Sequence, residues 1–254
     1  MKVLLILIEL FIISFLILRL SKLFKSYKKK NNDENFPTKL QIVLMETLPK
    51  HIALIVSREI TMLYYLFTRK TMKEEGMAFS YHKEIGYNGV LFALIGVILI
   101  ESVGLFFLLH AWIPVLSWVH LALNGYGLLY LVSDYRAIVK LPIILTEHDL
   151  FIRVGSRRQI KIPYERIASI NGGDRFLDQK KEKGIFKAIL IEFDTPQFEL
   201  NLKEPVTTTN LIGKPQEIMK VYITVDDKER FRQTLHQRLA SSQHANANEE
   251  IQEM

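Results

Sequence analysis

The sequence contains no cysteine, and this absence excludes several classes of functional site. Disulfide frameworks, cysteine nucleophiles and thiolate metal sites all require a thiol. The 254 residues also lack nucleotide-binding, metalloprotease and nucleophile motifs, and the seven histidines show no metal-ligand spacing along a single helix. We therefore predict no catalytic residue, no metal site and no cofactor.

Charged residues are scarce in three long apolar runs, although the whole chain carries a net charge of +6. Residues 3–18 and 89–109 each contain one charge, Glu9 and Glu101, and residues 111–133 contain only the ionisable His120. A helix needs about 20 apolar residues to cross a bilayer. The sequence therefore predicts three transmembrane helices, an anchor in residues 1–20 and a hairpin in residues 87–133. The basic excess then indicates anionic lipid rather than nucleic acid as a partner.

The first apolar run resembles a signal peptide in its position but not in its details. Only Lys2 precedes it, the run is long for a signal peptide, and basic residues rather than a small-residue cleavage site follow it. We favour an uncleaved anchor over a signal peptide.

The basic residues that flank the three runs predict one topology. Six of them follow the first run before any acidic residue: Arg19, Lys22, Lys25, Lys28, Lys29 and Lys30. The link between the second and third runs has no Lys or Arg, whereas Arg136 and Lys140 follow the third. Because Lys and Arg are enriched in cytoplasmic loops, we expect a multi-pass protein of the cell membrane with its N-terminus outside and its C-terminus in the cytoplasm.

Residues 21–86 are expected to be cytoplasmic and partly helical. Residues 38–67 have a helical pattern with a break near Pro49, and residues 52–67 are apolar apart from a polar centre. This stretch is too short and too polar to span a bilayer. It is typical of an amphipathic helix, which either lies on the membrane surface or packs against other helices.

Residues 141–240 show the period-two alternation of half-buried antiparallel strands. Leu150, Ile152 and Val154 begin the pattern, and residues 155–158 and 195–197 are the predicted turns of two hairpins. Asp226 and Glu229 form a capping-box pattern before a helix. The apolar stripe of that helix consists of Phe231, Leu235 and Leu239. Residues 241–254 are polar and are expected to be disordered.

Residues 162–170 (IPYERIASI) resemble the third strand of bacterial pleckstrin-homology-like (PH-like) domains, and residues 221–231 (VYITVDDKERF) resemble the junction of their last strand with the closing helix. The whole chain resembles uncharacterised bacterial integral membrane proteins in which a stretch like residues 79–83 (FSYHK) precedes a span holding a glutamate. Proteins of this kind sometimes carry a carotene-oxygenase name, which implies iron held by histidines in a propeller much longer than this chain. The resemblance implies a PH-like antiparallel β domain with a C-terminal helix, attached to membrane helices.

Two groups of side chains are candidate sites. Glu9, Glu101 and His120 are predicted at similar depth in the outer half of the membrane, where ionisable groups are costly. We expect Glu101 and His120 to meet between the second and third helices, with Glu9 a further candidate, and we favour a structural role over proton transfer. Arg153, Arg157, Arg158 and Lys161 lie on or beside one hairpin. They form either a solvated face or a site for anionic lipid or a protein partner.

Two functional hypotheses remain open at this stage. The first is a non-enzymatic scaffold or interaction protein, anchored at the inner face of the cell membrane, that binds a protein partner or a second copy of itself. The second is a membrane enzyme or proton-coupled carrier that uses the intramembrane residues Glu9, Glu101 and His120.

Overall fold

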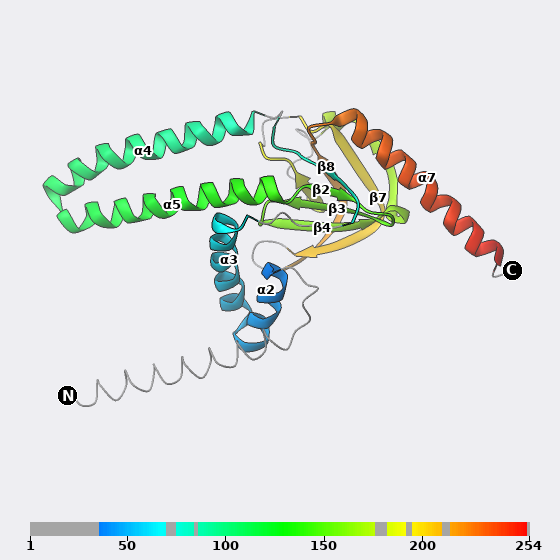
Figure 1. Cartoon of the computed structure of the whole chain (residues 1–254), viewed down its shortest axis with the longest axis horizontal. Helices are drawn as coiled ribbons and strands as arrows, with labels where there is room; N and C mark the ends of the chain where they lie inside the picture. Colours follow the sequence, from blue (N-terminus) through cyan, green and yellow to red (C-terminus); the bar gives the residue numbers. More distant parts are fainter. Residues whose placement is uncertain are drawn as a thin grey trace. The chain divides into compact units, whose positions relative to one another are not determined.

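The computed structural model describes residues 36–69, 75–83, 86–175, 182–191, 195–209 and 214–252. Glu9 and the predicted first span lie outside these ranges. The chain divides into two compact units, Met1–Tyr64 and Tyr65–Met254. Figure 1 shows the helices and strands along the chain.

Two helices, α2 (Phe36–Thr47) and α3 (Lys50–Phe67), precede the first strand. Pro49 separates them, as predicted, because proline cannot continue the hydrogen bonding of a helix interior. The Phe36 and Tyr64 rings are stacked with their centroids 4.7 Å apart. Ala53, Ser57 and Thr61 are buried along one side of α3, whereas large apolar side chains are exposed along the other.

The second and third apolar runs form a helical hairpin, α4 (Tyr87–Trp112) and α5 (Pro114–Lys140). Ile113 is extended between them, and Pro114 occupies the first turn of α5, where its missing N–H costs no hydrogen bond. Both helices are long and apolar enough to cross a membrane. Most of their large apolar side chains are exposed, among them Phe92, Ile100, Phe107, Val115 and Leu123. The sequence prediction of two long apolar helices is confirmed.

The remaining elements form two four-stranded sheets and one helix, α7 (Lys228–Gln252). The first sheet has the order β1-β2-β3-β4 and is antiparallel throughout. The second has the order β5-β7-β8-β6. The strands are β1 (Met77–Phe79), β2 (Ile143–Leu145), β3 (Asp149–Val154), β4 (Arg158–Pro163), β5 (Ile167–Asn171), β6 (Ile185–Ala188), β7 (Phe198–Thr209) and β8 (Pro215–Ile223).

The β domain differs from the sequence prediction in two places, at β6 and at β1. The β3–β4 hairpin and its turn are confirmed, but the second predicted hairpin is wrong. Residues 189–191 of the predicted strand are not in a strand; the strand is β6 instead, and it pairs with β8 in parallel. The domain also begins before residue 141, because β1 comes from the segment that precedes the hairpin and pairs with β2.

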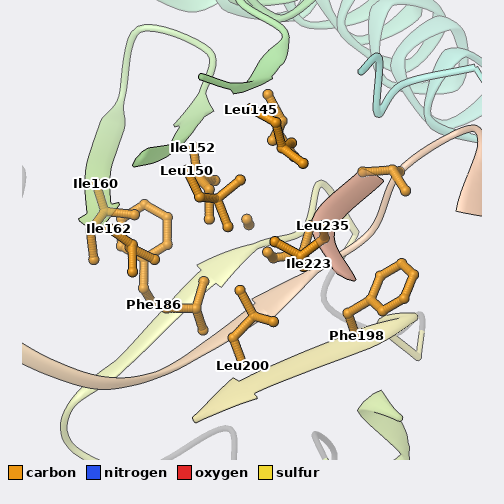
Figure 2. Packing of buried hydrophobic residues seen from close by; sticks show 14 of the residues in the cluster. Leu145, Leu150, Ile152, Ile160, Ile162, Phe186, Phe198, Leu200, Ile223 and Leu235 are labelled. Carbon is orange, nitrogen blue, oxygen red and sulfur yellow. The ribbon is translucent and has the colours of Figure 1, made fainter. Parts of the chain in front are cut away.

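One apolar core lies between the two sheets and α7. Figure 2 shows side chains from both sheets meeting Leu235 of α7. Phe231 and Leu235 are fully buried, and Leu239 packs partly buried against the same cluster, as the helical spacing predicts. The Thr208 hydroxyl donates a hydrogen bond to the Gln159 carbonyl and so links β7 to β4, across the two sheets.

The start and end of α7 are both shifted from their predicted places. The Arg230 N–H donates to the Asp227 carboxylate, so Asp227, not Asp226, caps the helix. Glu229 is therefore one position away from a capping box. The helix continues to Gln252, where disorder was expected from Ser241 on. Alanine, glutamine and glutamate in this stretch have good helix propensity, which lets the helix continue beyond its buried face.

We expect Leu235→Ala to lower the free energy of unfolding by about 2–5 kcal/mol, because it leaves a cavity in the closed core. Leu239→Ala, one turn later and partly exposed, should cost clearly less. Urea denaturation followed by circular dichroism would measure both. Equal losses for the two variants would contradict the packing of α7 described above.

Candidate functional site

The Asp226 side chain joins the start of α7 to the segment that leads into the hairpin. Its carboxylate accepts hydrogen bonds from the Lys83 N–H at 2.8 Å and from the His82 N–H at 3.3 Å. The Asp226 N–H donates to the Ser80 carbonyl at 2.8 Å. Three hydrogen bonds thus hold Asp226 against a segment that lies more than 140 positions earlier in the sequence.

Two aromatic side chains of the same segment are anchored in the β domain. The Phe79 ring packs edge-on against Phe231, with centroids 5.2 Å apart. The Tyr81 hydroxyl accepts a hydrogen bond from the Gly155 N–H at 2.9 Å. Burial raises the pKa of Tyr81 well above its usual value, so this residue stays neutral at physiological pH. Residues 79–83, which the sequence analysis noted as FSYHK, therefore form part of the β domain and its link to α4.

The end of α5 is connected to the β3–β4 turn by an ion pair. Asp134 is buried, and its carboxylate lies 3.1 Å from the Arg157 guanidinium nitrogen. Asp134 also hydrogen-bonds with the Tyr87 hydroxyl at the start of α4. Gly155 has a φ of 52°, and an added Cβ would lie 3.1 Å from both Asp134 and Ile138. Glycine thus permits both the turn and the close approach of α5.

His82 lies within this group of contacts and is buried, with 7% of its surface exposed. Its ring packs edge-on against Tyr135 of α5, and Tyr135 stacks on Tyr87 of α4. Burial lowers the pKa of His82, partly opposed by the nearby Asp226 carboxylate. Among the described residues, the His82 Nδ1 atom has no hydrogen-bond partner. A neutral imidazole is the form that this site favours.

These residues together form what we call the joint: Tyr81, His82, Tyr87, Asp134, Arg157 and Asp226. The joint draws on the segment before α4, the two hairpin helices, the β3–β4 turn and the start of α7. Its contacts position these chain segments relative to one another. The sequence analysis predicted no such joint: it assigned Arg157 to a candidate binding site and Asp226 to a helix cap, and the structural role of residues 79–83 was missed.

The four predicted basic residues each contact another group in the fold. Arg153 is buried, and its guanidinium lies 4.5 Å from the Phe151 ring centroid. Arg157 pairs with Asp134, and Arg158 lies over the Phe186 ring. Lys161 pairs with Asp149 at 2.8 Å, although the lysine side chain is more than half exposed. The contacts of Arg153 and Arg157 in particular are internal, which disfavours a shared anion site on this hairpin.

The polar contact between α4 and α5 contains His120, one of the two predicted residues, together with Ser102 and Asn124, which were not predicted. The Asn124 amide donates to the Ser102 hydroxyl at 2.8 Å and lies 3.1 Å from the His120 Nε2 atom. His120 therefore belongs to a polar group inside the hairpin, whereas Glu101 is exposed on α4. Ser102 takes the place expected for Glu101 because adjacent helical residues point about 100° apart.

A second polar contact, which the sequence analysis missed, lies near the turn of the hairpin. The His110 Nδ1 atom is 3.1 Å from the Ser117 hydroxyl, and that hydroxyl donates to the Pro114 carbonyl. Phe106 stacks on the His110 ring and packs edge-on against Trp118. Serine in an apolar run was the available signal, because buried serines commonly hydrogen-bond across membrane helices.

We expect Asp226→Ala to loosen residues 82 and 83 specifically. Removing the acceptor costs about 1–3 kcal/mol at the part-buried His82 N–H and less at the exposed Lys83 N–H. Hydrogen exchange should therefore accelerate by about tenfold or more at the His82 amide and by less at the Lys83 amide. Asp227→Ala is the matched control, because it removes only the helix cap and should accelerate exchange at Arg230. The role assigned to Asp226 is wrong if both variants alter the same amides.

We also expect His82 to make stability depend on pH. Its contribution is fully present above the unfolded-state pKa of about 6.5 and is lost as pH falls through the lower folded-state pKa, because the folded state resists protonation. His82→Gln should reduce the loss of thermal stability between about pH 7.5 and 5. His236→Gln, at an exposed position on α7, is the control. An unchanged pH dependence in His82→Gln would show that the burial of this ring has no energetic effect.

Comparisons with known proteins were made for the whole chain. No family model, curated protein or solved structure matches it. Among the described residues, no group of three or more histidine, aspartate or glutamate side chains could hold a metal ion.

Proposed function

We propose that this protein is a non-enzymatic scaffold, anchored in the cell membrane by the α4–α5 hairpin, that presents its β domain to a protein partner. The observation that carries this proposal is the exposed apolar surface of the hairpin. Such a surface is unstable in water and is stabilised by lipid. In both helices, only a small share of the apolar stretch is buried against the rest of the protein.

The joint supports the scaffold role. A domain that only needed tethering would require one flexible link to the membrane helix. Here the β domain contacts both ends of the hairpin, through residues 79–83 before α4 and through Asp134 near the end of α5. A rigid connection fixes the orientation of a binding surface relative to the bilayer, which is useful for assembly.

We further propose that the β domain is PH-like. Two packed sheets closed by one C-terminal amphipathic helix support this assignment, together with the resemblance of residues 162–170 and 221–231. The parallel pairing of β6 with β8 is a departure from a purely antiparallel domain. The strand β1, which pairs antiparallel with β2, comes from outside the predicted domain bounds. The internal contacts of the hairpin arginines favour a protein partner, or a second copy of the chain, over anionic head groups as the ligand.

The inner face of the cell membrane is the proposed side for the β domain. Arg136 and Lys140 follow the apolar part of α5, and the turn between α4 and α5 contains neither Lys nor Arg. This asymmetry supports a cytoplasmic C-terminus. The rival role as an enzyme or carrier has less support, because Ser102, Asn124 and His120 form a small network suited to holding two helices in register.

We expect the protein to stay in the membrane pellet after alkaline carbonate washing. Leu99→Arg with Leu123→Arg should release part of it, because an arginine at the centre of a span costs about 2.5–3.5 kcal/mol. Both leucines are exposed on the hairpin. Thr207→Arg, exposed on β7, is the control and should change nothing.

Quantitative release of the unmodified protein by carbonate would contradict the membrane anchor. A reporter fused after Met254 tests the proposed side, since it should be active only in the cytoplasm. Activity outside the cell or in the periplasm would invert the topology.

A further inference from the structure

Glu101 lies near the middle of α4 and has no partner in the part of the chain that the structure describes. Its side chain is exposed, and no hydrogen bond or ion pair of the described residues reaches its carboxyl group. At about 1.5 Å per residue, Glu101 lies about 21 Å along the helix from Tyr87 and about 16 Å from Trp112. In a helix that spans a bilayer, this position is close to the centre of the hydrocarbon core.

A carboxyl group at that depth is costly where it faces lipid, and it is stabilised by a polar partner. Glutamate is too short to reach either interface from the middle of a span. The hairpin directs a different residue at its own interior, because the Ser102 hydroxyl, one position on, meets Asn124 of α5. The apolar runs of the hairpin also contain no Lys or Arg that could pair with Glu101. The partner of Glu101 therefore comes from outside the hairpin.

The exposed residues around Glu101 form one stripe along α4, which we call the Glu101 stripe. It consists of Leu94, Val97, Glu101, Gly104 and Leu108, and helical spacing places all of them within about 60° of Glu101. The side chains of Leu94, Val97 and Leu108 are exposed by 47%, 58% and 56%. A Cβ added at Gly104 would meet nothing within 4 Å. A glycine in the stripe lets a second membrane helix approach closely.

We propose that the Glu101 stripe is the contact surface of a homodimer inside the membrane, in which α4 packs against α4 of a second copy. The inference rests on the proposed membrane anchoring of α4 and α5. A two-fold axis along the membrane normal brings a residue close to its own counterpart at equal depth. A second copy is the occupant because it supplies a carboxyl group at the depth of Glu101 without any other protein. With a proton on at least one of them, the two carboxyl groups hydrogen-bond across the axis.

Single cysteines test this surface directly, because the chain has no native thiol. Val97→Cys lies on the stripe, and Val103→Cys is the matched control, an exposed valine at similar depth but about 160° away around α4. Two differently tagged forms of the full chain would be reconstituted together in phosphatidylcholine–phosphatidylglycerol vesicles at a low protein-to-lipid ratio and oxidised with copper phenanthroline. Val97→Cys should give several-fold more disulfide-linked dimer containing both tags than Val103→Cys.

In the Val97→Cys background, Glu101→Leu should reduce the dimer several-fold, whereas Glu101→Gln, which keeps a donor and an acceptor, should retain it. Equal crosslinking at positions 97 and 103, or full retention of the dimer in Glu101→Leu, overturns the proposed pairing. Carbonate washing of the same vesicles separates this inference from the anchor. Protein that stays in the pellet without crosslinking at position 97 overturns the dimer, assigns Glu101 to another occupant and leaves the anchor intact. Protein that is released overturns the anchor and the dimer together.

Discussion

The contact of Asp226 with the backbone of residues 80–83 determines how the β domain and the hairpin are connected. One carboxylate accepts two N–H groups and the Asp226 N–H donates to a third backbone group. The same segment is also held by the pairing of β1 with β2, by Phe79 against Phe231 and by the Tyr81 hydroxyl at Gly155. Together these contacts give the β domain a connection to the start of α4 in addition to the one through α5.

The apolar side chains of the β domain and of the hairpin lie in different surroundings. The β domain buries its apolar side chains in one core, whereas the hairpin exposes most of its own. The joint lies between the buried core and the exposed hairpin, and it contains the tyrosines Tyr81 and Tyr87, which are both polar and aromatic. Side chains of this kind are stable where an apolar environment meets water. The chemistry of the joint thus agrees with a domain held close to a membrane surface.

The sequence predicted those parts of the fold that depend on local pattern. The apolar runs and Pro114 located α4 and α5, and period-two alternation located β3 and β4. Long-range contacts decided the parts that were missed. Either Asp226 or Asp227 could cap α7 by local rules, and only the contact with residues 82 and 83 distinguishes them. The strand β1 has only three residues and forms by pairing with the edge of β2. The strand β6 forms by parallel pairing with β8, which lies far along the chain.

For the polar contact inside the hairpin, the predicted Glu101 is next in sequence to Ser102, which makes the contact, but lies on another face of α4. Glu101 and Ser102 differ by one position, so a helical rotation of about 100° separates an exposed carboxylate from an interhelical hydroxyl. The sequence showed the arginines of the β3–β4 hairpin as one basic cluster. It could not show that Asp134 approaches Arg157 or that Arg153 is buried. Packing of α5 against the β3–β4 turn supplies that information.

The central claim is that the joint makes the hairpin and the β domain one rigid body. Pulsed electron spin resonance between spin labels at Val132→Cys on α5 and Glu165→Cys in the β domain tests it most directly. Both positions are exposed and outside the joint. The account predicts a narrow distance distribution in lipid bilayers, which becomes broad when Asp226→Ala and Arg157→Ala are added. A broad distribution in the unmodified joint would contradict it and would make the β domain a flexibly tethered module.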